Sequence, residues 1–295
     1  ADFASSGGDG YTSTAKAFAA TTAFSAAGNR SAWASTSGTS FRLRGDNSYS
    51  TALASITRAY NTGYLISDVR GAWLANSKTV DRSSKANTLT ENGTVTEAAV
   101  ESGAELNGYS GFSTSNYLSR ASDADWDVVG TGLITLSLWF NSTGPAGTEW
   151  LAGFGNTGNS LRFVILLQAD GNLNCTETGA TAAVETMSGG VNDDSVWHKV
   201  DYVRVSSTER YVYLDGVLAN STTTDAGSIS SSGNMLFRVG LGPDGSSFAA
   251  PTTKVSLVRL GASRAPSAAL VRQIYEAEKG MFVANAECLL QSGST

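Results

Sequence analysis

The strongest constraint on the fold is an alternation of residue types in short segments. Ile134, Leu136, Leu138 and Phe140 occupy every second position of one segment, with Thr, Ser and Trp side chains between them. Side chains of a strand point alternately to its two faces, so a period of two places the four apolar residues on one face. The segment is therefore predicted to be a half-buried β-strand.

Other segments extend this pattern through the chain. Arg162–Leu167 is a continuous apolar run suited to a central strand, and the tight-turn pair Asp170–Gly171 follows it. A second such pair is Asp215–Gly216. Further strands are predicted at Trp197–Val205, Tyr211–Ala219, Leu236–Gly240 and Val255–Leu260. Many short strands at this spacing indicate a β-sandwich.

One helix is expected after the last of these strands. Pro266 and Ser267 supply a start signal with Ser267 as the N-cap, and Gly280 stands where a helix-ending glycine belongs. An apolar stripe at helical spacing is formed by Leu270, Val271, Ile274 and Tyr275. This predicts a helix of about 13 residues that packs one face on the sandwich.

Residues 1–66 differ in composition from the rest of the chain. They consist largely of Ala, Ser, Thr and Gly with isolated aromatic residues, and such a stretch lacks the bulk for a core of its own. We expect an N-terminal arm or attachment region, with extended structure near Phe41–Leu43 and Ile56–Tyr64; a tail without fixed structure is the alternative. Residues 67–280 are expected to form the sandwich, and residues 281–295 a C-terminal tail without a clear period.

Charge and hydropathy exclude several classes of partner. The net charge is −6, and no basic run is longer than a pair, whereas binding to nucleic acid requires clustered Lys and Arg. No apolar run approaches the length that spans a bilayer, so no membrane insertion is expected. The first residues lack the basic start and apolar run of a signal peptide. Two cysteines, Cys175 and Cys288, allow one disulfide, although two buried thiols are the favoured interpretation.

Several segments resemble a known family. The run SVWHKVDYVRVSSTERYVYLDGVLAN resembles the signature hairpin of laminin G-like and pentraxin-type jelly rolls, and VSLVRLGASRAPSAALVRQIYEAEKG resembles their last strand and following helix. DVRGAWLAN and TLSLWF are similar to earlier strands of the same family, in the same order. The resemblance implies a mostly β, concanavalin A-like jelly roll with one short C-terminal helix, preceded here by an extended arm.

A narrower resemblance concerns biological role. AYNTGYLISDVRGAWLAN, ESGAELNGYSGFSTSNYLSRASDADWDVVGTG and IYEAEKGMFVANAECLL are similar to segments of tailed-bacteriophage virion structural proteins of the fibre or decoration type. This implies a virion or extracellular location, outward display of the jelly roll and contact with host-surface glycans. We also expect a homo-oligomer, with a trimer favoured, joined to other virion proteins through residues 1–66, because a weakly apolar arm of this length cannot fold alone. The alternative is a secreted bacterial lectin or adhesin.

Catalysis is not expected. The β-jelly-roll glucanases, which share this architecture, carry their carboxylates as Glu-x-Asp-x-x-Glu on one strand, a spacing that is absent here. Asp123, Asp125 and Asp127 alternate and would share a face if they lay on a strand, but a solvated loop is the favoured interpretation. His198 is the only histidine, and in the resembling hairpins the equivalent residue is structural.

Loop residues at the rim are the candidates for ligand binding. Glycan binding in such folds uses an aromatic ring with amides and carboxylates, which here gives Trp150, Asn156, Asn159, Asp193, Asp194, Asp244 and Phe248. A core position is favoured for Trp150. The resemblance places a calcium site at Asn156, Asn159 and Asp244, but a single carboxylate stands where pentraxins have several. Ordinary turn residues are therefore the favoured interpretation, and no resident cofactor is expected.

Overall fold

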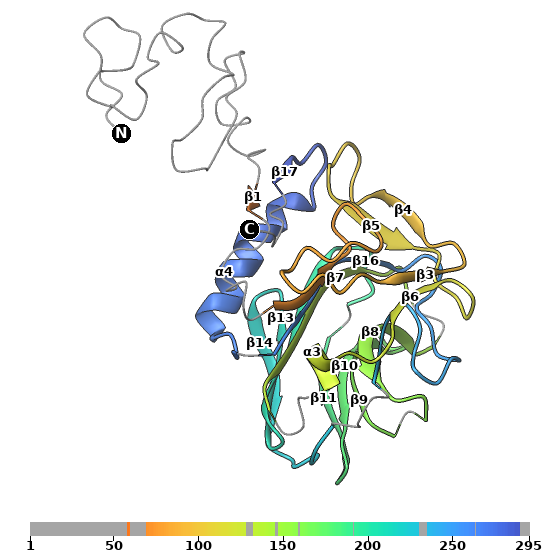
Figure 1. Cartoon of the computed structure of the whole chain (residues 1–295). Helices are drawn as coiled ribbons and strands as arrows, with labels where there is room; N and C mark the ends of the chain where they lie inside the picture. Colours follow the sequence, from red (N-terminus) through yellow and green to blue (C-terminus); the bar gives the residue numbers. More distant parts are fainter. Residues whose placement is uncertain are drawn as a thin grey trace, which may run out of the picture.

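The chain folds mainly into two antiparallel β-sheets that face each other, with one helix on the outside (Figure 1). The computed structural model describes residues 58–59, 69–127, 132–144, 147–158, 160–190, 192–229, 235–262 and 264–289. The expected mostly β jelly roll with a C-terminal helix is confirmed. The boundaries assigned to the arm, the jelly roll and the tail stay predictions.

The first sheet, named sheet I, contains the signature hairpin. Its strand order is β14 (Val217–Thr222), β13 (Glu209–Leu214), β12 (His198–Ser206), β7 (Ile134–Asn141), β16 (Lys254–Gly261), β5 (Asn107–Ser110) and β4 (Thr96–Ala99), and β2 (Val69–Trp73) also pairs with β16. The β13–β14 turn holds Asp215 and Gly216 at φ of 51° and 77°. Two positive φ angles are typical of the type I′ hairpin turn that this residue pair predicts.

The second sheet, named sheet II, contains the predicted central strand. Its order is β11 (Ala183–Met187), β10 (Leu173–Thr178), β9 (Arg162–Leu167), β8 (Glu149–Gly155), β15 (Leu236–Val239), β6 (Tyr117–Arg120) and β3 (Thr90–Asn92). The apolar run at β9 lies inside the sheet, as expected. The main hydrophobic core fills the space between the two sheets and includes Phe163, Tyr202 and Phe237.

The alternating strand β7 departs from its prediction. Leu136, Leu138 and Phe140 face the main core, but all eight residues of β7 are buried, including Thr135, Ser137 and Trp139. The strand is therefore not half-buried. The reason is that further residues pack on the outer face of sheet I. The period of two within one strand does not reveal them.

Helix α4 (Ala268–Glu278) supplies part of that cover. Ser267 caps it as predicted, since its hydroxyl oxygen accepts a hydrogen bond from the Leu270 backbone N–H at 3.2 Å. Gly280, in contrast, does not end the helix in a left-handed conformation; it lies within the 3-10 helix η3 (Lys279–Met281). The extra turn brings Met281 and Phe282 against sheet I, where both are buried.

The outer face of sheet I thus forms a second core. The ring of Phe282 stacks on that of Trp139 with centroids 4.1 Å apart, and Trp139 Nε1 donates to Glu278 Oε2 at 2.8 Å. Glu278 also pairs with Arg259, and both side chains are buried. Helix α4 is therefore fixed to the sheet by an apolar contact and by a buried carboxylate.

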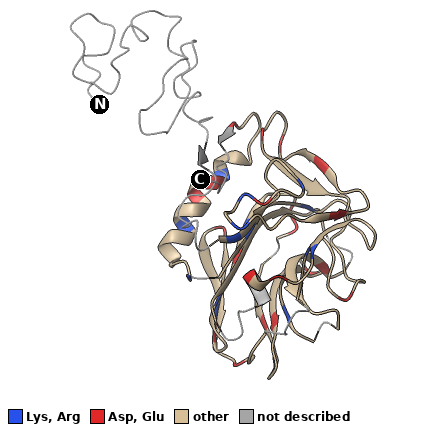
Figure 2. Cartoon of the chain, viewed as in Figure 1, with Lys and Arg blue, Asp and Glu red and all other residues tan. Residues whose placement is uncertain are grey.

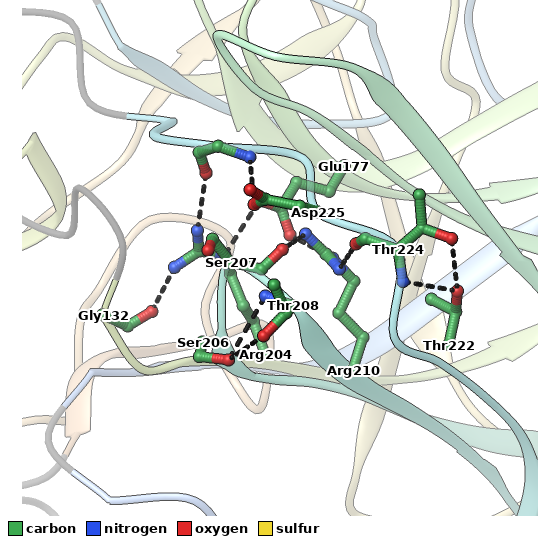
Figure 3. Close-up of polar contacts among 11 residues, drawn as sticks. Gly132, Glu177, Arg204, Ser206, Ser207, Thr208, Arg210, Thr222, Thr224 and Asp225 are labelled. Carbon is green, nitrogen blue, oxygen red and sulfur yellow. Dashed lines mark hydrogen bonds and ion pairs between the residues drawn. The ribbon is translucent and has the colours of Figure 1, made fainter.

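A cluster of charged side chains lies between the sheets at one end of the sandwich (Figure 3). Glu177 on β10 of sheet II accepts from Arg204 and Arg210 on sheet I, and all three side chains are fully buried. Backbone oxygens of Gly227 and Thr224 accept further guanidinium donors. A buried charge is tolerated when it is paired and hydrogen-bonded, so this cluster ties the two sheets together.

The acidic segment at residues 123–127 forms the short helix α3 (Ala124–Asp127), so its carboxylates do not share a strand face. The Asp125 carboxylate forms ion pairs with Arg70 and Lys85 and accepts from Asn87 Nδ2 at 2.8 Å. Burial raises the pKa of Asp125, but the bonds to Asn87, Lys85 and Arg70 outweigh this and leave it lowered. The Asp125 carboxylate is held in local structural contacts.

Two short strands far apart in the sequence pair beside helix α4. Strand β1 (Arg58–Ala59) pairs in parallel with β17 (Cys288–Leu289), and β1 also contacts α4. The strand falls within the extended structure expected near Ile56–Tyr64, whereas Phe41–Leu43 lies outside the described residues. Cys175 is a free, buried thiol. No helix among the described residues is long and apolar enough to cross a membrane.

Candidate functional site

The outer face of sheet II is built differently from that of sheet I. On β6, Leu118 faces the main core, so its neighbours Tyr117 and Ser119 point to the outside. Arg238 on β15 is opposite Ser119 and lies between the core residues Phe237 and Val239, which places it on the same outer face. All three outward side chains are half-buried rather than covered. This part of sheet II is accessible to a ligand.

Arg238 is held in a defined position on this face. Its Nη1 donates to the Gly242 backbone oxygen at 2.6 Å, and its guanidinium carbon lies 5.3 Å from the centroid of the Tyr117 ring. Asn92 on the adjacent β3 donates through Nδ2 to Ser119 Oγ at 2.9 Å. An aromatic ring, a cation, a hydroxyl and an amide are therefore brought together by three neighbouring strands. We name Asn92, Tyr117, Ser119 and Arg238 the sheet II patch.

The loop between β15 and β16 covers the neighbouring strand β8. Gly153 and Gly155 leave no side chain on the outer face there, and Pro243 packs where a side chain at position 155 would stand. Gly242 lies against the Trp150 ring, which is 1% exposed and packs with Val164 and Leu166. Trp150 occupies the buried position favoured by its sequence context. In this conformation the ring is not open for stacking on a sugar.

The remaining candidate residues lie in separate loops. Asn156 follows β8, and its Oδ1 accepts the backbone N–H groups of Ser160 and Leu161. Asp244 accepts the N–H groups of Ser246 and Ser247, while Phe248 is half-buried and forms a bridge with Leu241. Asn159 lies outside the described residues. Asn156 and Asp244 are near each other, because Pro243 contacts Gly155, but each oxygen named here serves its own turn.

Asp193 and Asp194 lie at the other end of β8, near Glu149. The Glu149 carboxyl is buried and accepts from Thr253 Oγ1 at 2.7 Å. Burial raises the pKa of Glu149, and the nearby negative charge of Asp193 contributes to the same direction. Asp194 is exposed and pairs with His198. The structure therefore separates this acidic pair from Asn156 by the length of a strand.

His198 links two loops at the rim. Its Nδ1 lies 2.8 Å from Asp215 Oδ2 in the β13–β14 turn, and its Nε2 lies 3.2 Å from Asp194 Oδ1 in the β11–β12 loop. Burial lowers the pKa of His198, but the bonds and charges of Asp215 and Asp194 outweigh this effect and leave it raised. A ring that faces two carboxylates favours the imidazolium, which can donate to both.

A calcium site at Asn156, Asn159 and Asp244 stays a prediction. Ca²⁺ takes six to eight oxygen ligands, and carboxylates supply most of its binding energy. Asp244 offers one carboxylate there, already bonded to the Ser247 hydroxyl at 3.1 Å. Among the described residues, no three His, Cys, Asp or Glu side chains are grouped closely enough to hold a metal ion.

Sequence reasoning did not identify the sheet II patch. The alternation in Tyr117–Arg120 shows that Tyr117 and Ser119 share a face, but the segment is only four residues long. Arg238 and Asn92 join them through the pairing of β15 and β3 with β6, across separations of many residues. The period of two could have placed Tyr117 and Ser119 on one face. The sequence does not give the strand order that brings Asn92 and Arg238 beside them.

Comparison with known proteins shows that part of the chain is similar to a known family. Residues 112–258 match the sequence model of the concanavalin A-like lectin/glucanases superfamily, Laminin_G_3. No curated protein sequence matches the chain significantly. The matched region includes β7 to β15 and most of β16, and therefore most of both sheets.

Solved structures show the same fold at low sequence identity. The binding domain of Paraclostridial Mosquitocidal Protein 1 superposes with a TM-score of 0.56 at 11% identity, over 72% of this chain and 52% of that one. Domain 4 of AbnA, a GH43 extracellular arabinanase from Geobacillus stearothermophilus solved with arabinotriose, gives 0.54 at 16% identity over 70% and 98%. The botulinum neurotoxin serotype D ligand-binding domain, solved with N-acetylneuraminic acid, gives 0.53 at 11% over 72% and 52%. The match spans about half the length of the toxin binding domains.

Proposed function

We propose that this chain, built on a jelly roll of the concanavalin A-like lectin/glucanases type, is a virion structural protein that binds carbohydrate on its outward side. The observation that carries the proposal is the difference between the two outer faces of the sandwich. Helix α4 and the segment that follows it cover the outer face of sheet I, whereas the sheet II patch stays accessible.

Carbohydrate binding is supported by the chemistry of the patch. Sugars present apolar C–H faces that pack on aromatic rings, and hydroxyl groups that exchange hydrogen bonds with amides, hydroxyls and guanidinium groups. Tyr117, Ser119, Asn92 and Arg238 supply these groups on adjacent strands. Arabinotriose and N-acetylneuraminic acid are named with two proteins of the same fold, which adds support.

The virion role is supported by the position of the N-terminal entry. Strand β1 lies beside α4, on the outer side of sheet I and away from sheet II (Figure 1). An arm formed by residues 1–66 would thus attach to a particle on one side, while the jelly roll displays the patch on the other. The resemblance of three segments to phage fibre and decoration proteins points to the same role, as a capsid or tail appendage.

The carbohydrate proposal is tested by screening the full chain against a glycan panel and measuring hits by calorimetry. We expect binding that weakens at least about tenfold when Tyr117 and Ser119 are both replaced by Ala, which corresponds to about 1.4 kcal/mol. Binding that is unchanged in this double variant would remove the patch from the proposal. The same incubations, followed by product analysis, test our proposal that the domain binds without turnover.

The particle role is tested by the solution mass of the full chain and of a chain beginning at Ser67. We propose a homo-oligomer, with a trimer favoured, that depends on residues 1–66. Loss of assembly in the shorter chain, with an unchanged circular dichroism spectrum, would support the arm as the assembly element. Two compact monomers that still bind sugar would instead favour the second candidate, a secreted bacterial lectin or adhesin.

A further inference from the structure

The outer face of sheet II carries two arginines that lack a carboxylate partner among the described residues. They are Arg162 on β9, whose Nε donates to Thr178 Oγ1 at 3.1 Å, and Arg238 on β15. Elsewhere in the same sandwich, Arg204, Arg210 and Arg259 each pair with a buried glutamate. The outer face of sheet II therefore differs from the buried parts of the sandwich, because its two arginines have no carboxylate partner among the described residues.

Arg238 is the more constrained of the two. Its Nη1 donates to the Gly242 oxygen, its guanidinium carbon lies 5.3 Å from the centroid of the Tyr117 ring, and its Nε is buried with no hydrogen-bond partner in the described structure. A donor withdrawn from water without a partner is costly, and a ligand oxygen relieves that cost when the side chain shifts enough to expose Nε. The guanidinium is thus oriented by the protein while part of its donor capacity stays unused.

No acid occupies the strand positions that flank Arg238 on the outer face; Asp244 lies beside Gly242 in the neighbouring loop, where it accepts the N–H groups of Ser246 and Ser247. The outward positions of β3, β6 and β15 that flank it are Asn92, Tyr117 and Ser119, which are all uncharged. Glu91 on β3 pairs with Leu118, a core-facing residue, and its carboxylate binds Lys78 at 2.8 Å. Charged residues are sparse over most of the ribbon (Figure 2). A single oriented cation on a neutral surface favours one carboxylate of a ligand.

We infer that the sheet II patch recognises a sugar of the uronic acid class, with Arg238 binding the carboxylate. Guanidinium and carboxylate groups match in a bidentate geometry, and such bonds are stronger than neutral ones. Ser119 and Asn92 then contact hydroxyl groups, and the edge of Tyr117 packs on the ring. This inference rests on the proposed carbohydrate function and names its ligand class. The net charge of −6 opposes dense polyanions, so short or terminal acidic sugars are the preferred form.

The test compares matched ligands on the full chain by calorimetry at physiological ionic strength. Short oligogalacturonates and oligoglucuronates are paired with their methyl esters, which keep the sugar and remove the charge. We expect an acidic oligosaccharide to bind at least about tenfold more tightly than its ester. Arg238→Gln should abolish this preference. Arg238→Lys should retain part of it, because Lys keeps the positive charge but lacks the planar guanidinium that binds a carboxylate through two hydrogen bonds.

Arg162→Gln is the matched control, since it removes the other uncompensated arginine of the same face. It should leave the acid-to-ester ratio unchanged. Equal binding of acid and ester, failure of every acidic oligosaccharide, or an unchanged ratio in a folded Arg238→Gln variant would overturn the inference. If neutral glycans still bind in those cases, the proposed carbohydrate function survives; if no glycan of either kind binds, that function fails as well.

Discussion

The outer faces of the two sheets differ in how they are covered. On sheet I, helix α4 and the segment that follows it bury the outward side chain of Trp139, so the central strand β7 is covered on both sides. Sheet II leaves Tyr117 and Arg238 half-buried at one end, whereas most of the outward side chains of β8, β9 and β10 are buried. The difference indicates that the covered face contributes to stability, while the proposed recognition depends on the half-buried end of sheet II.

The largest loss in the free energy of unfolding is expected from the buried charge cluster between the two sheets. Glu177→Ala would strand Arg204 and Arg210 between the sheets without their carboxylate. Removing one partner of a buried ion pair costs about 3–5 kcal/mol, and two stranded cations place this variant near the upper end. Urea denaturation provides the measurement. The control is Glu185→Ala on the neighbouring strand β11, where the side chain is exposed and the change should be within about 0.5 kcal/mol.

A second variant addresses the cover of sheet I. Glu278→Ala leaves Arg259 buried without its carboxylate and removes the acceptor of the Trp139 indole N–H. We expect a loss of about 4 kcal/mol in the free energy of unfolding. Glu276→Ala, on the solvent side of the same helix, breaks only surface pairs with Arg272 and Lys279 and should cost at most about 1 kcal/mol. Similar losses for the two variants would mean that α4 is not fixed through Glu278.

Two tyrosines allow the faces to be compared with one kind of substitution. Tyr213 lies on the outer face of sheet I, is 5% exposed and packs with Val271 of α4, whereas Tyr117 lies half-buried on sheet II. Tyr213→Ala should destabilise the fold by about 3 kcal/mol and Tyr117→Ala by about 1 kcal/mol. Thermal and urea unfolding of both variants give these values. If Tyr117→Ala were the more destabilising variant, the position of Tyr117 would not be less covered than that of Tyr213.

The smallest expected effect is a pH dependence at the rim between the sheets. The pKa of His198 is raised in the folded chain, so protonation stabilises the fold. This contribution is fully present below the unfolded pKa of about 6.5 and is lost as the pH rises through the higher folded value. The stability advantage of the wild-type chain over His198→Gln should therefore fall between about pH 6 and pH 8. An advantage that grows with pH over this range would show that the neutral ring is the form stabilised.

Strands and turns could be predicted from the sequence because their signals are local. Alternation located β7, an apolar run located β9, and Asp215–Gly216 specified the turn between β13 and β14. Ser267 was also identified as the cap of α4, since capping depends on residues three positions apart. The candidate site residues stay predictions: Trp150 is buried, as its sequence context favoured, and Asn156 and Asp194 lie at different ends of the sandwich.

By itself, then, the sequence determined a β-sandwich, several strand positions and the beginning of the last helix, because these follow from side-chain period and turn chemistry over a few residues. The jelly-roll class followed from the resemblance of whole segments to a known family. The tertiary structure alone decided that β7 is buried on both faces, that Glu177 meets two arginines of the opposite sheet, and that Arg238 lies over Tyr117. Each of these depends on which distant segments become neighbours. That choice is made by packing and by the pairing of buried charges, which no local pattern records.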